Sequence, residues 1–177
     1  GDSDIELKKY FPNLTEKQLI DLLYQKYVNI QKAWMEFDYH SLKKLCTDEL
    51  YQTYCNDLEA LDEWHEKNII NQFEFLEGNI NGVHKDGNRF VVNMSLHVAC
   101  FDYIVERDTN TVIRGHTDEK KHYQYCLEYV VHISSEQFQC PSCGADLEMG
   151  INECPYCHII LHSKYSAFVL NDKRKVS

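Results

Sequence analysis

Two tight pairs of cysteines constrain this chain more than any other feature: Cys140 with Cys143, and Cys154 with Cys157. Each Cys-x-x-Cys pair can fold as a knuckle that points two thiolates at one place. Two knuckles together supply the tetrahedral four-sulfur shell of a structural zinc site. Because a closed shell leaves no position for a catalytic water, we expect the metal to stabilise structure rather than to perform chemistry. The same four thiolates also suit iron, so they favour zinc without excluding iron.

Two other uses of such cysteines fit the sequence less well. A thioredoxin-like redox site needs one pair at a helix N-terminus inside a βαβ unit, whereas this chain has two pairs. Disulfide frameworks are typical of small secreted scaffolds that pair all their cysteines. Here four further cysteines have no partner by spacing: Cys46, Cys55, Cys100 and Cys126. Cysteine usage therefore predicts a metal site in a reducing compartment.

The length and charge of the chain limit its class of partner. With 177 residues, of which 44% are hydrophobic, the chain is long enough for one domain with a small appendage. A net charge of −10 opposes binding to a phosphate backbone. Residues 138–160, which hold the knuckles, contain no Lys or Arg to grip DNA or RNA. We therefore expect no nucleic-acid partner.

Apolar periodicity predicts helices in the first third of the chain. Thr15 and Gln18 form a capping box, and an apolar stripe at helical spacing follows from Leu19 to Phe37. Thr47 is expected to cap a further helix that ends near Trp64.

The rest of the chain reads as strands. Alternating or apolar segments predict strands at residues 68–83, 90–105, 123–133 and 165–170, with a hairpin turn at Asp86-Gly87. Helices followed by a meander of long strands define an α+β fold, with the N-terminal helices packed on an antiparallel sheet.

The order of these segments also suggests domain limits. Because a strand follows the knuckles, we expect a zinc ribbon at residues 138–160, inserted in a domain of residues 15–170. Residues 1–14 are expected to be an amphipathic lead-in or a terminus that packs on the domain. The basic residues 173–175 are expected to form a solvated tail.

Two stretches of the chain resemble the Tim44-like domain, a family named after the membrane-anchoring subunit of the mitochondrial inner-membrane import motor. They comprise residues 33–42 (AWMEFDYHSL) with 47–51 (TDELY), and residues 101–105 (FDYIV) with 112–115 (VIRG). The resemblance covers most of residues 15–170, and bacterial members often carry a zinc ribbon near the C-terminus. It implies a cone-shaped fold similar to nuclear transport factor two, in which a curved antiparallel sheet wraps a long helix and leaves an apolar pocket. It also implies membrane association, and it transfers no catalytic residues.

The walls of such a pocket are expected to come from the long helix and from the tyrosine-rich face of the third strand, at Trp34, Phe37, Tyr123, Tyr125 and Tyr129. We therefore expect a non-catalytic, membrane-associated scaffold or binding module, related to transport, that takes a lipid or a peptide. Its partner is expected to be a membrane lipid or a membrane protein, at the cytoplasmic face of a membrane. No apolar run approaches the ~20 residues of a bilayer-spanning helix, and residue 1 is Gly rather than Met, so we expect any anchor to lie upstream.

An enzyme is the alternative, because the same cone fold hosts isomerases and dehydratases. Such sites need an acid or base inside the pocket. His97 and Asp102 are candidates on one strand, but their odd separation places them on opposite faces unless a bulge intervenes. Glu128 and His132 share one face of the next long strand. We expect each of the four to be a surface or hydrogen-bonded polar residue rather than a catalytic one.

Overall fold

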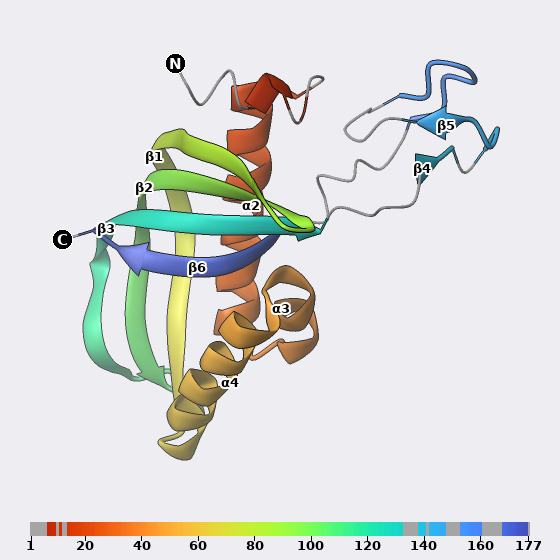
Figure 1. The fold of residues 1–177 in the computed structure, drawn as a ribbon. Coiled ribbons are helices and arrows are strands. Elements are labelled where there is room, and N and C mark those ends of the chain that lie inside the picture. The colour runs from red at the N-terminus through yellow and green to blue at the C-terminus, as the bar shows by residue number, and fades with distance from the viewer. Residues whose placement is uncertain are drawn as a thin grey trace.

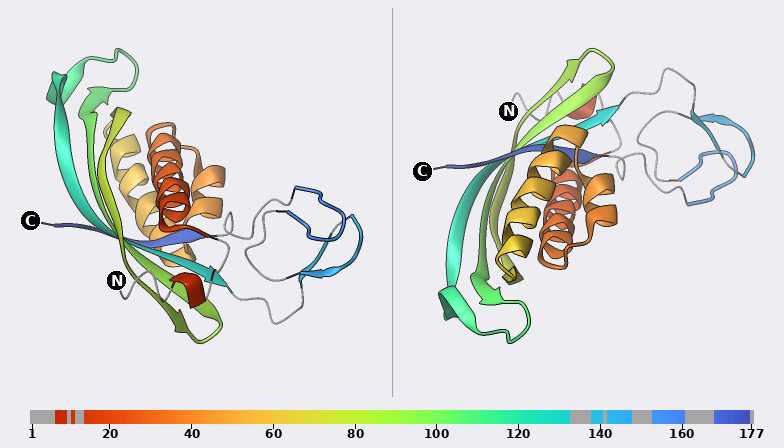
Figure 2. Two further views of the ribbon diagram at one scale, coloured as in Figure 1. Left: turned by 90° about the horizontal axis from the view of Figure 1, so that it is seen from above. Right: turned by 90° about the horizontal axis from the view of Figure 1, so that it is seen from below.

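The computed structural model describes residues 7–9, 11, 14–132, 138–140, 142–147, 153–160 and 168–176. Helices come first and strands follow, so the fold is α+β as predicted. Four strands form a curved antiparallel sheet, and the long helices lie on its concave side (Figures 1 and 2). Two of the candidate sites lie between these helices and the sheet.

Helix α2 (Glu16–Met35) is the long helix around which the sheet curves. Thr15 Oγ1 accepts a hydrogen bond from the Gln18 N–H, and the Gln18 side chain accepts one from the Thr15 N–H. The predicted capping box is therefore present, and it satisfies two backbone donors at the start of the helix. The buried stripe of α2 faces the sheet through Leu19, Leu23, Tyr27 and Ile30.

Helices α3 (Tyr39–Leu45) and α4 (Asp48–Glu63) follow α2 on the same side of the sheet. Asp38 caps α3, because its carboxylate accepts hydrogen bonds from the Ser41 N–H at 3.1 Å and the Ser41 hydroxyl at 2.6 Å. Thr47 occupies the predicted N-cap position of α4, but its side chain makes no capping hydrogen bond. Its backbone N–H instead donates to the Leu170 carbonyl at 2.9 Å, which ties the start of α4 to the last strand.

The main sheet has the strand order β1-β2-β3-β6, with antiparallel neighbours throughout. Its strands are β1 (Glu66–Asp86), β2 (Arg89–Glu106), β3 (Val112–His132) and β6 (Val169–Lys175). Gly87, with a φ of 60°, makes the tight β1–β2 turn that the Asp-Gly pair predicts. Register shifts after Asn71, Phe75 and Ile80 are bulges in the β1–β2 ladder. Bulges bend and twist a strand, so they allow these long strands to curve around the helices.

One hydrophobic core fills the space between the concave face and the helices. Alternate residues of β2 face this core: Phe90, Val92, Met94, Leu96 and Val98. Leu7 and Phe11 belong to the same core, and the rings of Phe11 and Phe90 lie 5.1 Å apart. Leu7 and Phe11 of the lead-in therefore pack on the domain, whereas Lys8 and Lys9 are exposed.

The C-terminal strand differs from the sequence expectation. The basic character of residues 173–175 predicts a solvated tail, but these residues continue β6 and pair with residues 125–127 of β3. The ammonium group of Lys173 lies over the ring of Tyr125, at 5.2 Å from its centroid, and 5.7 Å from that of Tyr54. These two tyrosines come from β3 and α4, which are distant in sequence, so the local sequence around Lys173 does not predict the contacts.

Strands β4 (Phe138–Gln139) and β5 (Asp146–Leu147) form a separate two-stranded sheet. This unit stands to one side of the curved sheet in Figure 1. It has a small core of its own, made by Cys140, Leu147 and Cys154. The cysteine-rich segment therefore precedes the last strand, as predicted.

Candidate functional site

The four paired cysteines converge on one point. The Sγ atoms of Cys140, Cys143, Cys154 and Cys157 all lie within 4.8 Å of one another. Two of the Sγ···Sγ distances, between Cys140 and Cys157 and between Cys143 and Cys154, are 3.6 and 3.7 Å. Tetrahedral zinc–sulfur bonds of ~2.3 Å place sulfurs about 3.8 Å apart, whereas a disulfide needs ~2.05 Å. The four thiols are therefore free, and their spacing fits an S4 metal shell.

The two knuckles have the same backbone conformation and the same hydrogen bonds. In each, the N–H of the second cysteine points at the Sγ of the first, with an N···S distance of 3.5 Å. Gly144 and His158 close the knuckles, because each N–H donates at 2.9 Å to the carbonyl of the cysteine four residues earlier. Both residues are left-handed, with φ of 75° and 65°. The Cys143 N–H also lowers the pKa of the Cys140 thiol to about 6, which favours the thiolate that a metal needs.

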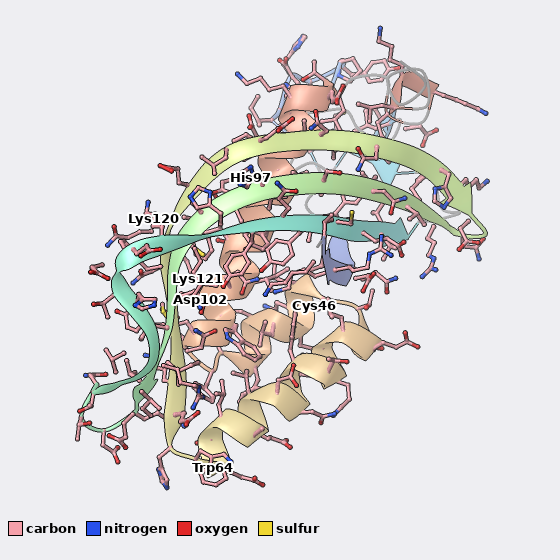
Figure 3. All side chains as sticks on the ribbon, turned by 90° about the vertical axis from the view of Figure 1, so that its left-hand side faces the viewer. Cys46, Trp64, His97, Asp102, Lys120 and Lys121 are labelled. Carbon is pink, nitrogen blue, oxygen red and sulfur yellow. The ribbon has the colours of Figure 1, made fainter. Side chains whose placement is uncertain are left out.

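A mainly apolar groove of about 410 Å³ lies between α4 and the first residues of β1. Trp34 of α2 lines it, and Trp64, at the end of α4, is 75% exposed (Figure 3). The carboxyl-bearing residues on the groove are Asp57 and Glu66, and Glu66 pairs with Arg114 at 2.6 Å. The remaining lining residues are Ala60, Leu61, Asn68 and Ile104.

A second cavity, of about 260 Å³, lies deeper between the helices and the sheet, and we call it the inner cavity. It shares Trp34, Asp57 and Asn68 with the groove. The other lining residues are Ile30, Gln31, Tyr54, Ile70, Asp102, Tyr125 and Lys173. The family resemblance implies an apolar pocket, whereas the inner cavity contains a carboxylate and an ammonium group.

A chain of hydrogen bonds runs along one wall of the inner cavity and joins α2 to three strands. The indole N–H of Trp34 donates to Asn68 Oδ1 at 2.9 Å, and Asn68 Nδ2 donates to Asp102 Oδ1 at 2.8 Å. The Tyr123 hydroxyl donates to Asp102 Oδ2 at 2.6 Å. Burial, and then the hydrogen bond to Asp102, raises the pKa of Tyr123 far above its usual value, so the phenol remains a donor at any physiological pH.

The five predicted pocket residues fall in different places. Trp34 lines both the groove and the inner cavity, and Tyr125 lines the inner cavity. Tyr123 reaches that cavity through its hydrogen bond to the cavity residue Asp102. Phe37 lines neither site, and its ring lies 4.1 Å from a guanidinium group of the β2–β3 turn. Tyr129 is fully buried in the core and donates at 2.8 Å to a backbone carbonyl of α2.

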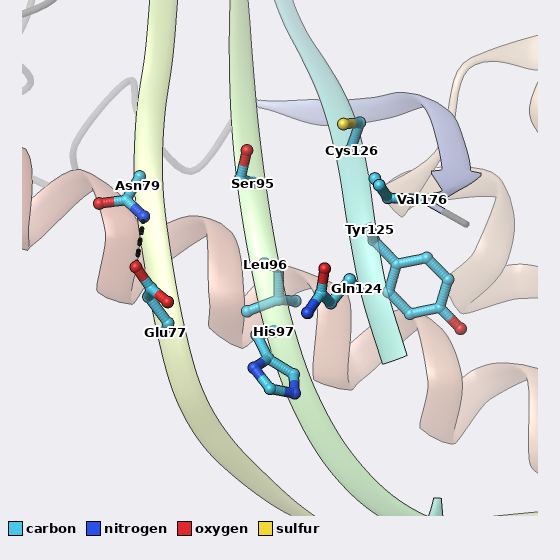
Figure 4. A pocket seen from close by; sticks show the side chains of 9 residues that line it. All are labelled: Glu77, Asn79, Ser95, Leu96, His97, Gln124, Tyr125, Cys126 and Val176. Carbon is cyan, nitrogen blue, oxygen red and sulfur yellow. Dashed lines mark hydrogen bonds between the residues drawn. The ribbon is translucent and has the colours of Figure 1, made fainter. Parts of the chain in front are cut away.

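His97 and Asp102 lie on opposite faces of the sheet, as their odd separation predicts. Asp102 lines the inner cavity on the concave side. His97 lines a shallow hollow on the convex side, with Glu77, Ser95, Gln124 and Cys126 around it (Figure 4). Its Nε2 atom lies 3.4 Å from Nδ1 of His122. The two residues therefore form no catalytic dyad.

The second pair of enzyme candidates is also not assembled by the described residues. Glu128 is partly buried and its Oε1 accepts a hydrogen bond from Asn171 Nδ2 at 2.8 Å, so it is a hydrogen-bonded polar residue. The side chain of His132 lies outside the described residues.

Lys173 lines the inner cavity, although the sequence predicts that it lies in a solvated tail. Leu170 pairs with Tyr129 and Asp172 pairs with Glu128, so Asn171 is an extra residue in β6. This bulge reverses the alternation of the strand, and Lys173 points to the concave side although its number differs in parity from the buried Leu170. No pattern in the sequence alone would have located the bulge.

Comparison with known proteins agrees with this fold. The Tim44-like domain family matches residues 5–133, which is more than half of the chain and ends before β4. The chain therefore belongs to the Tim44-like domain family. Members of this family are generally non-enzymatic and are associated with membranes and with protein partners.

A solved structure shares the fold over most of its length. It is the intermembrane-space region of the chloroplast protein ARC6, at 9% identity and a TM-score of 0.50, over 93% of this chain and 98% of that one. A search of curated protein sequences finds no match. None of the helices that the structure describes has the length and apolar character needed to cross a membrane.

Proposed function

We propose that this chain is a non-catalytic, membrane-associated scaffold or binding module, related to transport, in which the groove beside Trp64 takes a lipid chain or an apolar side chain of a membrane-bound peptide. Membership of the Tim44-like family supports the general class. The observation that carries the finer proposal is the apolar groove between α4 and β1, with an exposed indole at its edge. Exposed apolar surface rimmed by polar groups is typical of protein and membrane interaction sites.

The groove lies at an end of the molecule where other apolar side chains are exposed. Val112 and Ile113, at the start of β3, are both about half exposed. The Arg107 N–H of the β2–β3 turn donates to the His65 carbonyl at 2.7 Å, so this hairpin is attached to the end of α4. Tryptophan is favoured at membrane surfaces because its ring is apolar and its N–H is polar. Trp64 is therefore the residue that we expect to enter the interface.

The metal in this proposal has a structural role. Cys140, Cys143, Cys154 and Cys157 hold zinc, or iron in the same four-thiolate shell, and the ion closes the small core of residues 138–160. We take this unit as an insertion in a domain of residues 15–170. Cys46, Cys55 and Cys100 are free and buried, which is consistent with the reducing conditions at the cytoplasmic face of a membrane.

A pocket enzyme of the cone fold, such as an isomerase or dehydratase, is the second candidate, and the inner cavity is the observation that favours it. Asp102, Tyr123 and Lys173 bring a carboxylate, a phenol and an amine to this region. Both carboxylate oxygens of Asp102 already accept hydrogen bonds, from Asn68 and Tyr123, so a substrate would have to compete with these two donors. Turnover of a carbonyl compound that depends on Asp102 would favour the enzyme.

Vesicle flotation tests the proposed function. The purified chain is mixed with zwitterionic phosphatidylcholine vesicles, because its charge of −10 would oppose anionic lipid. We expect the chain to float with the vesicles, and Trp64→Ala to weaken binding about tenfold or more, since a buried Trp side chain contributes more than about 1.4 kcal/mol. Tyr156→Ala is the matched control, because Tyr156 is 70% exposed but lies on the cysteine-rich unit. No flotation, or equal loss in both variants, would contradict the proposal.

A further inference from the structure

The inner cavity is lined by a cation, Lys173, that forms no ion pair with the described residues. The ammonium group of Lys173 lies over the rings of Tyr125 and Tyr54, at 5.2 and 5.7 Å from their centroids. Across the part of the chain that the structure describes, no carboxylate oxygen lies within ion-pair distance of it. Lys173 as a whole residue is only partly buried, because β6 is an edge strand, but its charged end lines the cavity.

A second donor lines the same cavity. The hydroxyl of Tyr54 is buried and has no hydrogen-bond partner among the described residues. Gln31, only 4% exposed, also lines the cavity. Buried polar groups in proteins are nearly always hydrogen-bonded, so an unpaired hydroxyl and an ammonium group on the lining of one cavity point to a ligand that pairs with them. An oxygen that accepts hydrogen bonds and carries negative charge satisfies both.

The carboxylates of the cavity limit how much negative charge a ligand can bring. Asp102 accepts hydrogen bonds from Tyr123 and Asn68 and is not paired with Lys173. Asp57 adds a further carboxyl group to the lining. Among anions that could reach the Lys173 ammonium group, a monoanion meets less repulsion from these two carboxylates than a phosphate dianion does.

The size and walls of the cavity limit the rest of the ligand. Its volume of about 260 Å³ is below the ~300 Å³ at which pockets for drug-sized ligands begin, so only a small molecule fits. Trp34, Tyr54 and Tyr125 present aromatic rings, and the rings of Trp34 and Tyr54 lie 5.7 Å apart. Aromatic walls favour a flat apolar body, which can stack on them or meet them edge to face.

We propose that the inner cavity binds a small aromatic monocarboxylate, with the ligand carboxylate against the Lys173 ammonium group and the Tyr54 hydroxyl, and the ligand ring between the aromatic walls. The inner cavity differs from the groove beside Trp64 in the charged groups of its lining and in its proposed ligand. The proposal of carboxylate binding is therefore independent of whether the chain binds vesicles.

The protonation of Lys173 sets the pH dependence of this binding. The titratable groups around its ammonium and on the cavity lining are Tyr54 and Asp57 on α4, Cys100 and Asp102 on β2, Tyr125 on β3, Cys46 before α4, and Lys175 on β6. Loss of water around the group lowers the pKa of Lys173 to about 8, against the attraction of Asp102. The ammonium form is present below this pKa and is lost above it. Affinity for a carboxylate should therefore be highest below pH 8 and fall as the pH rises through this range.

Titration with sodium benzoate tests the proposal, with amide NMR shifts and calorimetry as readouts at pH 6.5 and pH 9.5. We expect saturable binding at pH 6.5, with shifts at Tyr54, Tyr125 and Lys173, and weaker binding at pH 9.5. Lys173→Met keeps the apolar stem and should weaken binding about tenfold or more, as expected for one charge-assisted hydrogen bond. Arg174→Met is the control, because Arg174 is an exposed cation of the same strand and pairs with Cys126, which lines the convex hollow.

Two further measurements keep the result decisive. Tyr54→Phe removes only the second donor and should also weaken benzoate binding. It provides the test of the site if Lys173→Met fails to fold. Sodium phosphate and sodium acetate should bind more weakly than benzoate. The proposal is overturned by the absence of saturable benzoate binding, by an equal effect of Lys173→Met and Arg174→Met, or by tighter binding of phosphate.

Discussion

The Tyr123 hydroxyl lies 2.6 Å from Asp102 Oδ2, and this hydrogen bond joins β3 to β2 on the wall of the inner cavity. Asp102 is held on its other side by Asn68, which in turn accepts the indole N–H of Trp34. Groups on α2, β1, β2 and β3 are therefore fixed relative to one another. The network positions the cavity wall, and among the described residues neither oxygen of Asp102 forms an ion pair with Lys173.

The Tyr123–Asp102 bond should contribute measurably to stability. Tyr123→Phe removes the donor and leaves Asp102 Oδ2 without its partner, so we expect a loss of about 1–3 kcal/mol in the free energy of unfolding. Urea unfolding followed by circular dichroism measures this. Tyr156→Phe is the control, since Tyr156 is exposed and distant in the chain. A change in Tyr123→Phe no larger than that of the control would mean that the bond is not formed in solution.

The cysteine cluster should hold one metal ion per chain. Elemental analysis of the purified chain should give about one zinc or iron. Cys143→Ser should release the metal and unfold the unit around β4 and β5, because that unit has a separate small core. The circular dichroism of the main sheet should persist. Metal-free wild-type protein with a disulfide between the knuckles would contradict the site.

The residue that follows the second cysteine is Gly144 in one knuckle and His158 in the other. Exchanging the residue types tests whether backbone conformation controls metal retention. His158 adopts a left-handed conformation that Gly144 adopts in the first knuckle, and this conformation costs a residue with a Cβ about 1–2 kcal/mol. His158→Gly should therefore strengthen retention of the metal against a chelator, whereas Gly144→Ala should weaken it. Effects of the same sign in both variants would show that the backbone conformation is not the controlling factor.

The chain should not bind nucleic acid. Its net charge is −10, and the knuckle segment from 138 to 160 contains no Lys or Arg. Fluorescence anisotropy with DNA and RNA oligonucleotides at low salt should show no saturable change. Tight binding that weakens steeply with added salt would contradict this prediction.

Much of the fold follows from local sequence signals. Thr15 and Gln18 mark the start of α2, and Asp86-Gly87 marks the first hairpin turn, because capping and turn formation depend on neighbouring residues. The knuckle cysteines are found in the same way, because ligand spacing is local.

The sites on the concave side depend on tertiary structure and were less predictable. The groove forms where α4 meets the start of β1, and the inner cavity needs residues from α2, α4 and four strands that interact only after folding. Lys173 faces this cavity because of the bulge at Asn171, which no alternation pattern shows. The sequence indicated Trp34 and Tyr125 as pocket residues, but not Lys173, whose ammonium group lies over the ring of Tyr125.

The fluorescence of Trp64 in the presence of membranes tests the central claim of membrane association most directly. The chain has two tryptophans, and in Trp34→Phe only Trp64 remains. Because Trp64 is 75% exposed, its emission in buffer should be that of an indole in water. Phosphatidylcholine vesicles should shift this emission to the blue, and brominated acyl chains should quench it, since the ring enters the apolar boundary. Unchanged emission at saturating lipid would contradict the account.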